Sequence, residues 1–146
     1  MIHVKQLSIM VLIIIMAACK KEKTPAPTDD TITILQSGDW KLTAFTISPA
    51  LNGITDVMQN IPPCAKDNLL QFKPNSIFYF DEGATKCDPS YPQIFSLPWK
   101  FADNETKLIL GTDENAILVL TATTLKLRYT FEDAGVIYTE EDTYEH

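Results

Sequence analysis

The sequence predicts an all-β domain, an eight-stranded antiparallel up-and-down barrel, and three observations support this. Stretches rich in β-branched and aromatic residues recur between residues 40 and 144, as is typical of strands. Turn-forming residues separate most of them at intervals of roughly ten residues, the spacing of a meander that closes into a barrel. The chain of 146 residues has room for one such core and not for two.

The strand at 124–131 alternates most clearly, with four apolar residues on one face and Arg128 among the polar residues on the other. In the strand at 97–103, Trp99 should point inward because it alternates with Lys100. Lys73-Pro74-Asn75-Ser76 is a strong hairpin signal. The eight expected strands are 40–47, 68–72, 77–81, 97–103, 107–110, 116–123, 124–131 and 136–144.

Two proline- and glycine-containing stretches, 49–66 and 82–96, interrupt the strand pattern. The first leaves room for a short helix over 54–60, directly after the first strand. The acidic run at 140–142 is expected to protect a sheet edge or to keep the domain soluble.

The N-terminus has the organisation of an export signal. Lys5 precedes an apolar run at 7–16, and Ala17, Ala18 and Cys19 follow it. The run is about half the length that a membrane-spanning helix needs. Met16-Ala17-Ala18-Cys19 resembles the bacterial lipobox, and this resemblance implies cleavage after Ala18 and acylation of Cys19, including a palmitate-type chain.

The predicted organisation is therefore a lipoprotein signal peptide at 1–18, a lipidated flexible tether at 19–35 and a barrel domain at 36–146. A membrane is the expected partner through the acyl chains, since one chain alone binds only marginally. The sequence Lys20-Lys21-Glu22-Lys23 loosely resembles charged signals that send lipoproteins to the cell surface. We expect the cell envelope, at the outer membrane, on its periplasmic face or at the surface.

Charge and cysteine usage agree with export. The formal net charge is −7 and Arg128 is the sole arginine, which argues against nucleic acid as a partner. With Cys19 acylated, Cys64 and Cys87 remain, and a cysteine pair in an oxidising compartment indicates a disulfide. Their spacing lacks the close pairing of zinc ligands.

An ordered set of features resembles the lipocalin-like lipoproteins of Gram-negative bacteria. Gly38-Asp39-Trp40 is similar to the Gly-x-Trp signature that opens lipocalins. A Cys then precedes Asp67-Asn68, another follows a Glu-Gly turn, and a Trp strand and a Thr-Thr-Leu strand come next. The resemblance implies a barrel whose Trp40 packs at the closed end. An arginine often stacks on that ring in the family, but the alternation of its strand points Arg128 outward.

Enzymatic function is not expected. The two histidines are His3, in the signal, and His146, so histidine-based catalysis and His-ligated metals lack their central group. No nucleophile elbow, phosphate loop or dinucleotide fingerprint occurs. Acidic residues abound, and Asp81, Glu82 and Asp88 raise a calcium alternative, but their spacing matches no known calcium loop. We expect no cofactor and no catalytic residue.

The remaining expectation is binding. An eight-stranded barrel is wide enough for one small molecule, and a small apolar ligand in or at the barrel is the first hypothesis. The alternative is a protein-interaction module whose barrel is a scaffold filled by its own side chains. A cavity of a few hundred Å³ would favour the first hypothesis. The candidate ligand-binding residues are aromatic: Trp40, Phe72, Tyr79, Trp99 and Tyr129.

Overall fold

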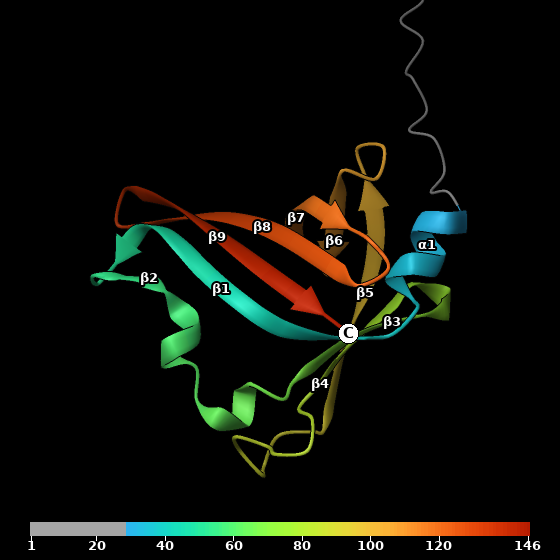
Figure 1. The fold of residues 1–146 in the computed structure, drawn as a ribbon, viewed down its shortest axis with the longest axis horizontal. Coiled ribbons are helices and arrows are strands. Elements are labelled where there is room, and N and C mark those ends of the chain that lie inside the picture. The colour runs from blue at the N-terminus through green and yellow to red at the C-terminus, as the bar shows by residue number, and fades with distance from the viewer. Residues whose placement is uncertain (1–28) are drawn as a thin grey trace, which may run out of the picture.

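A computed structural model describes residues 29–146 of the chain (Figure 1). The predicted signal peptide, Cys19 and residues 20–28 lie outside the described residues. Within residues 29–146, one short α-helix and nine strands form, with three 3₁₀ turns between strands. The elements are α1 (Asp29–Leu35), β1 (Asp39–Leu51), β2 (Ile54–Asp56), η1 (Val57–Asn60), η2 (Pro63–Ala65), β3 (Leu69–Lys73), η3 (Pro74–Ser76), β4 (Ile77–Asp81), β5 (Ile94–Ala102), β6 (Lys107–Leu110), β7 (Asp113–Leu120), β8 (Thr124–Asp133) and β9 (Val136–Glu145).

The strands close into an antiparallel barrel. Within residues 29–146, β1 and β3 to β9 follow one another around the sheet, and β1 pairs with β9 to close it. The short strand β2 adds to β1 as a hairpin outside the closed set. The predicted eight-stranded up-and-down barrel is therefore confirmed, and its strand order is that of a lipocalin-like fold. The strand β2 was not predicted.

Several local predictions are also confirmed, with shifted boundaries. The expected hairpin before β4 turns through η3, where Asn75 has a φ of 63°. The last hairpin uses the two-residue loop Ala134-Gly135, in which both residues have positive φ, as hairpin turns require. The short helix allowed at 54–60 is the 3₁₀ turn η1, and β2 occupies the residues before it.

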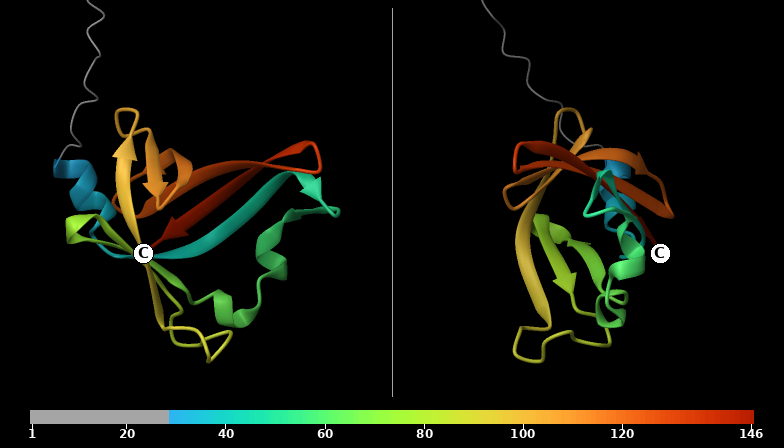
Figure 2. Two further views of the ribbon diagram at one scale, coloured as in Figure 1. Left: turned by 180° about the vertical axis from the view of Figure 1, so that it is seen from behind. Right: turned by 90° about the vertical axis from the view of Figure 1, so that its left-hand side faces the viewer.

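The barrel is closed at one end and splayed at the other. β1 pairs with β3 only from Asp39 to Lys41, whereas its pairing with β9 runs from Lys41 to Ser48. Beyond Lys41, the group β8, β9 and β1 diverges from the group β3, β4 and β5, and the segment from β2 to η2 runs between them (Figures 1 and 2). The barrel wall therefore has a gap at this end that irregular chain covers.

The closed end holds the hydrophobic core. Leu35 at the end of α1 is fully buried in it. The predicted tether therefore ends earlier than residue 35: α1 belongs to the domain, because Leu35 gains burial that a solvated tether would not give it. No helix within residues 29–146 has the length and apolar character to cross a bilayer. The buried core residues are Leu35, Trp40, Leu70, Phe72, Phe78, Trp99, Leu108, Leu125 and Leu127.

The acidic run at 140–142 does not lie at a sheet edge, so the first of the two roles expected of it is wrong. β9 pairs with β8 on one side and with β1 on the other. Asp142 stands directly opposite Leu127 and Phe45, and paired residues in an antiparallel ladder share a face. Glu140 and Asp142 therefore lie on the inner face of the sheet, and Glu141 lies on the outer face.

Candidate functional site: a pocket in the open half of the barrel

A pocket of about 330 Å³ lies where the barrel wall separates. Inner-face residues of β1, β3, β4 and β9 form its floor, and the segment around η2 forms its roof. Its volume falls in the range of small-molecule sites, roughly 300–1,000 Å³. The lining residues are Leu42, Phe45, Ile61, Pro62, Ala65, Asn68, Leu70, Phe80, Asp142 and Tyr144.

The walls are apolar because strand alternation directs these side chains inward. Leu70 of β3 is paired with Phe80 of β4, so the two side chains share the inner face. On β1 the register shifts between Leu42 and Ala44. This bulge lets both Leu42 and Phe45 face inward although they are three positions apart.

The roof is held by the disulfide between Cys64 and Cys87. The bond is present as expected, with the two Cα atoms 5.2 Å apart. It links η2 to the long connection between β4 and β5. The Asn68 side-chain amide has its nitrogen toward two backbone carbonyls. It donates to Cys64 O at 3.3 Å and to Glu82 O at 3.0 Å. The roof is thus tied to the connection between β4 and β5 by a covalent bond and by hydrogen bonds.

Asp67 and Gly83 complete the same junction. Asp67 Oδ2 accepts hydrogen bonds from the backbone N–H groups of Ala84 (3.0 Å) and Thr85 (2.9 Å). Gly83 has a φ of +67°, and a Cβ there would lie 2.3 Å from the Asp67 carbonyl oxygen. Only glycine allows this approach. The Asp67-Asn68 pair and the Glu-Gly turn noted in the sequence therefore form one structural junction beside the pocket.

Two polar groups enter the apolar pocket from β9. The Tyr144 hydroxyl donates to Asp142 Oδ2 at 3.2 Å. Asp142 Oδ1 is shut off from solvent and has no hydrogen-bond partner among the described residues. Burial raises the pKa of Asp142 to about 6, opposed by the Tyr144 hydrogen bond and assisted by the charge of Glu140. Burial, followed by the charge of Asp142, also raises the pKa of Tyr144, so its hydroxyl stays neutral.

A smaller hollow of about 160 Å³ adjoins this pocket and shares Phe45 with it. Glu140 lines the hollow together with Ile47, Leu51, Ile54 and other residues of the β1–β2 hairpin and η1. Burial raises the pKa of Glu140 above its ordinary value. Two carboxylates on alternate residues of one strand therefore face neighbouring apolar hollows.

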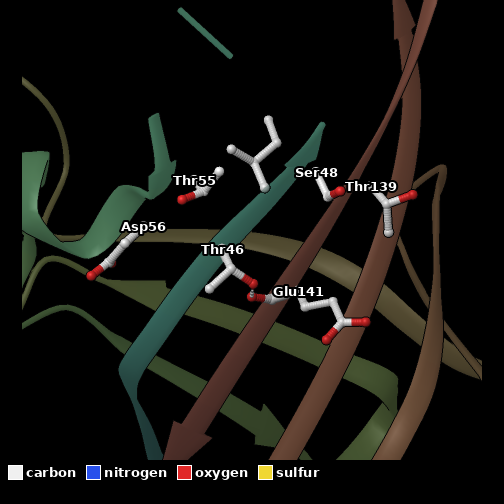
Figure 3. A pocket seen from close by; sticks show the side chains of 7 residues that line it. Thr46, Ser48, Thr55, Asp56, Thr139 and Glu141 are labelled. Atoms are coloured by element: carbon white, nitrogen blue, oxygen red, sulfur yellow. Dashed lines mark hydrogen bonds between the residues drawn. The ribbon is translucent and has the colours of Figure 1, made fainter. Parts of the chain in front are cut away.

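A third hollow, of about 410 Å³, lies on the outer side of the sheet and has a different character (Figure 3). Hydroxyl side chains from three strands dominate it. Its one carboxylate on β9, Glu141, is already paired with Lys126 Nζ at 2.6 Å and with Arg128 Nη2 at 2.6 Å. The residues that line it are Thr46, Ile47, Ser48, Thr55, Asp56, Thr139 and Glu141.

Three of the five predicted ligand-binding aromatics are core residues of the closed end. Trp40 is 0% exposed, and Phe72 and Trp99 are also buried. Trp40 Nε1 donates to Leu35 O at 2.8 Å, and the Phe72 and Trp99 rings meet edge to face at 5.6 Å between centroids. These rings fill the barrel themselves, and none of them lines the pocket. The burial predicted for Trp40 and Trp99 is confirmed.

The other two predicted aromatics also lie away from the pocket. Tyr79 pairs with Gln71 and Ser96 on the outer face, between inward-facing Phe78 and Phe80. Tyr129 shares the inner face of β8 with Leu127 and is partly exposed. Its ring stacks with Phe131, 6.1 Å between centroids, beyond the core.

The ring that contacts Trp40 belongs to His146. The two rings are 4.4 Å apart at a 75° angle. Arg128 instead lies on the outer face with Glu141, as its alternation predicted. Gly38 lies beside the same ring: a Cβ there would lie 2.4 Å from His146 Nδ1, so a larger residue would require the imidazole to shift. Gly38 and Trp40 thus have structural roles at the closed end.

The sequence analysis missed the residues that give the pocket its character, chiefly Phe45, Asp142 and Tyr144. A usable signal existed in β9, where every second residue from 138 to 144 is aromatic or acidic: Tyr138, Glu140, Asp142 and Tyr144. Two acids in phase with two aromatic residues indicate a polar group on an apolar face. No group of three or more His, Cys, Asp or Glu side chains suited to a metal ion occurs within residues 29–146.

The class defined by the fold and site is a lipocalin-like barrel with an apolar pocket at its open end. Neither a protein-family model nor a curated protein sequence matches the chain. Among solved structures, a deswapped triple mutant of bovine odorant binding protein is similar to it, with a TM-score of 0.43 and 12% sequence identity. That match covers 77% of this chain and 74% of that chain. The fold assignment here rests on the strand pairing.

Proposed function

We propose that this protein is a lipid-anchored binding protein of the cell envelope that holds a small apolar molecule in the open half of its barrel. The observation that carries the proposal is the pocket of about 330 Å³, whose walls are mainly aliphatic and aromatic. A few polar groups in an otherwise apolar cavity are typical of ligand sites. A scaffold barrel would instead fill both halves with its own side chains.

Binding without catalysis is the second part of the proposal. The pocket brings Asp142, Tyr144 and Asn68 together. Tyr144 bonds to Asp142, and Asn68 is engaged by backbone carbonyls. A general acid or base must be free to reach the proton that it transfers on the substrate. In this set the tyrosine and amide serve the protein's own hydrogen bonds, which supports recognition as the role of the site.

The experiment blocks the pocket from its roof. Ala65 lines the pocket from η2, and Ala65→Trp would fill it, whereas Ala122→Trp places the same ring on an exposed turn outside it. The full chain is purified in digitonin. It is then exposed to a dodecanol that carries a diazirine photolabel.

We expect the dodecanol probe to label the wild type and Ala122→Trp at saturable levels, and labelling of Ala65→Trp to fall to background. Equal labelling of all three proteins would overturn the pocket as the binding site. Near-ultraviolet circular dichroism and an intact disulfide establish that both variants are folded. If Ala65→Trp fails this check, Ala65→Phe replaces it.

The anchor is supported by the signal-like sequence that ends at Cys19. A single acyl chain binds membranes marginally, and several chains anchor stably. Cys19→Ser should therefore remove the acyl mass and release the protein from the membrane fraction. A Cys19→Ser protein that lacks acyl chains but stays in the membrane fraction would contradict the anchor.

A protein-interaction role is the second candidate, and one observation favours it. Tyr91 is 65% exposed and Phe95 is 55% exposed, and both border a hollow of about 150 Å³ beside Phe80. Exposed aromatic residues are enriched at protein interfaces. Crosslinking in the native envelope tests this role: a specific partner lost in a Tyr91→Ser, Phe95→Ser double variant would favour it, and unchanged products would exclude this surface.

A further inference from the structure

We infer that the pocket selects amphiphiles with a positively charged amine head and an apolar body over anionic ones such as fatty acids. This inference rests on the proposed function and names the ligand class. It starts from the polar groups of the pocket and its neighbour, which are acidic, amide or hydroxyl groups. No lysine, arginine or histidine lines either cavity.

The charge at the centre of the argument is Asp142. Its Oδ1 atom is buried and lacks a partner within the part of the chain that the structure describes, and its Oδ2 has only the Tyr144 hydroxyl at 3.2 Å. A buried carboxylate without a cation or full hydrogen bonding is costly. A ligand ammonium group in the pocket would supply the missing opposite charge, whereas a ligand carboxylate would add a like charge.

Glu140 extends the same preference toward the hairpin. It lies two residues from Asp142 on the inner face of β9, roughly 6.8 Å along the strand, and lines the adjoining hollow. Phe45 borders both cavities. An apolar chain can thus contact Phe45, Leu42 and Phe80 while its head meets a negative field from two side chains.

The lysine and arginine of β8 do not cancel this field from the inner side. Lys126 and Arg128 point to the outer face, where both are paired with Glu141. The side chains of β8 and β1 that oppose Asp142 are Leu127 and Phe45. Among the facing groups, therefore, only Tyr144 and Glu140 titrate, and neither carries positive charge.

The test uses three diazirine probes with the same twelve-carbon chain: the primary amine, the alcohol and the carboxylic acid. Each is applied at pH 7.5 to the full chain in digitonin, as the wild type and as Asp142→Asn. Labelling of each probe is expressed as the ratio of wild type to variant, so that partition into detergent cancels. Glu141→Gln, on the outer face, is the matched control for loss of one negative charge.

We expect the amine ratio to be about tenfold, the ratio to which 1.4 kcal/mol corresponds. The alcohol ratio should stay near one and the acid ratio should fall below one, while Glu141→Gln leaves all three probes at wild-type levels. At pH 5, below the raised pKa of Asp142, the amine advantage should shrink because most of the Asp142 charge is lost. An amine ratio near one alongside specific alcohol labelling would overturn the inference but leave the proposed function standing. Absence of specific labelling by every probe would overturn both.

Discussion

The two ends of this barrel are built from the same strands but differ in what fills them: side chains at the closed end and a cavity at the open end. At the closed end, Trp40, Phe72 and Trp99 interlock with few polar atoms, and the Trp40 N–H is satisfied by Leu35. At the open end, the same alternation brings Asp142 and Glu140 inward, next to Phe45 and an unfilled cavity. The closed end stabilises the fold, and the open end carries a carboxylate whose charged form is disfavoured by burial.

The difference arises from the pairing partners of β1. Where β1 pairs with both β3 and β9, the barrel is narrow enough for side chains to fill it. Where β1 leaves β3, the gap is covered by a segment that the Cys64–Cys87 disulfide holds in place. A covalent link and a glycine junction replace strand pairing there, and the cavity is the space that results.

The largest effect should come from the closed end. Trp40→Ala removes a fully buried ring and one hydrogen bond, and such truncations usually cost about 3–5 kcal/mol of unfolding free energy. We expect a sharp drop in melting temperature or loss of folding. Tyr91→Ala, which truncates an exposed ring, is the control and should melt like the wild type. A Trp40→Ala protein with unchanged melting would contradict the division of roles.

Removal of the disulfide should come next, and it should affect the open end in particular. In the chain-entropy model a loop of about 24 residues closed by a disulfide contributes roughly 3 kcal/mol. The Cys64→Ser, Cys87→Ser double variant should therefore unfold at lower denaturant concentration, and dodecanol labelling of its pocket should weaken. Normal labelling in a destabilised but folded double variant would show that the roof of the pocket keeps its position without the disulfide.

Asp142→Asn should stabilise the protein, with a definite pH dependence. The pKa of Asp142 is raised from 3.8 to about 6 by burial, so the folded state binds more protons than the unfolded state between these values. Stability therefore falls as pH rises from about 4 to 6, and the cost remains above pH 6. The asparagine variant should gain about 2–3 kcal/mol at pH 7.5 and little at pH 4.

Urea unfolding of Asp142→Asn at the two pH values measures this gain. The groups facing Asp142 are Tyr144 and Glu140, and Glu140 has its pKa raised in the same direction. The unfolding free energy of the variant should therefore still fall between the two pH values, but by less than that of the wild type. A variant less stable than the wild type at pH 7.5 would mean that the carboxylate is needed for the fold, which contradicts its assignment to a site.

The sequence was most informative where residues alternate and where composition is typical. The eight strands and the inward ring of Trp99 followed from period-two patterns, and Cys64 with Cys87 followed from the count of cysteines. The buried position of Trp40 followed from the resemblance to lipocalin-like lipoproteins. Leu35 was assigned to the tether because a polar segment precedes it. Its burial depends on packing against core residues from distant strands, which no local pattern reveals.

The pocket was the least predictable feature. Glu140-Glu141-Asp142 reads as a solvated acidic run, and its division into two inward residues and one outward residue depends on β1 pairing with β9 across about a hundred residues of sequence. Of the five aromatic residues expected to contact a ligand, Trp40, Phe72 and Trp99 are core residues, and the other two lie away from the pocket. Aromatic content indicates burial, but whether a buried face is filled or hollow depends on how neighbouring strands diverge.

Mapping of the residues modified by the dodecanol photoprobe tests the central claim most directly, because it compares the two ends in one experiment. The full chain is labelled, digested and sequenced by mass spectrometry. We predict modification at Leu42, Phe45 and Phe80, which line the open half, and none at Trp40, Phe72 or Trp99. Specific modification of the three closed-end rings, with the open half unlabelled, would contradict the account.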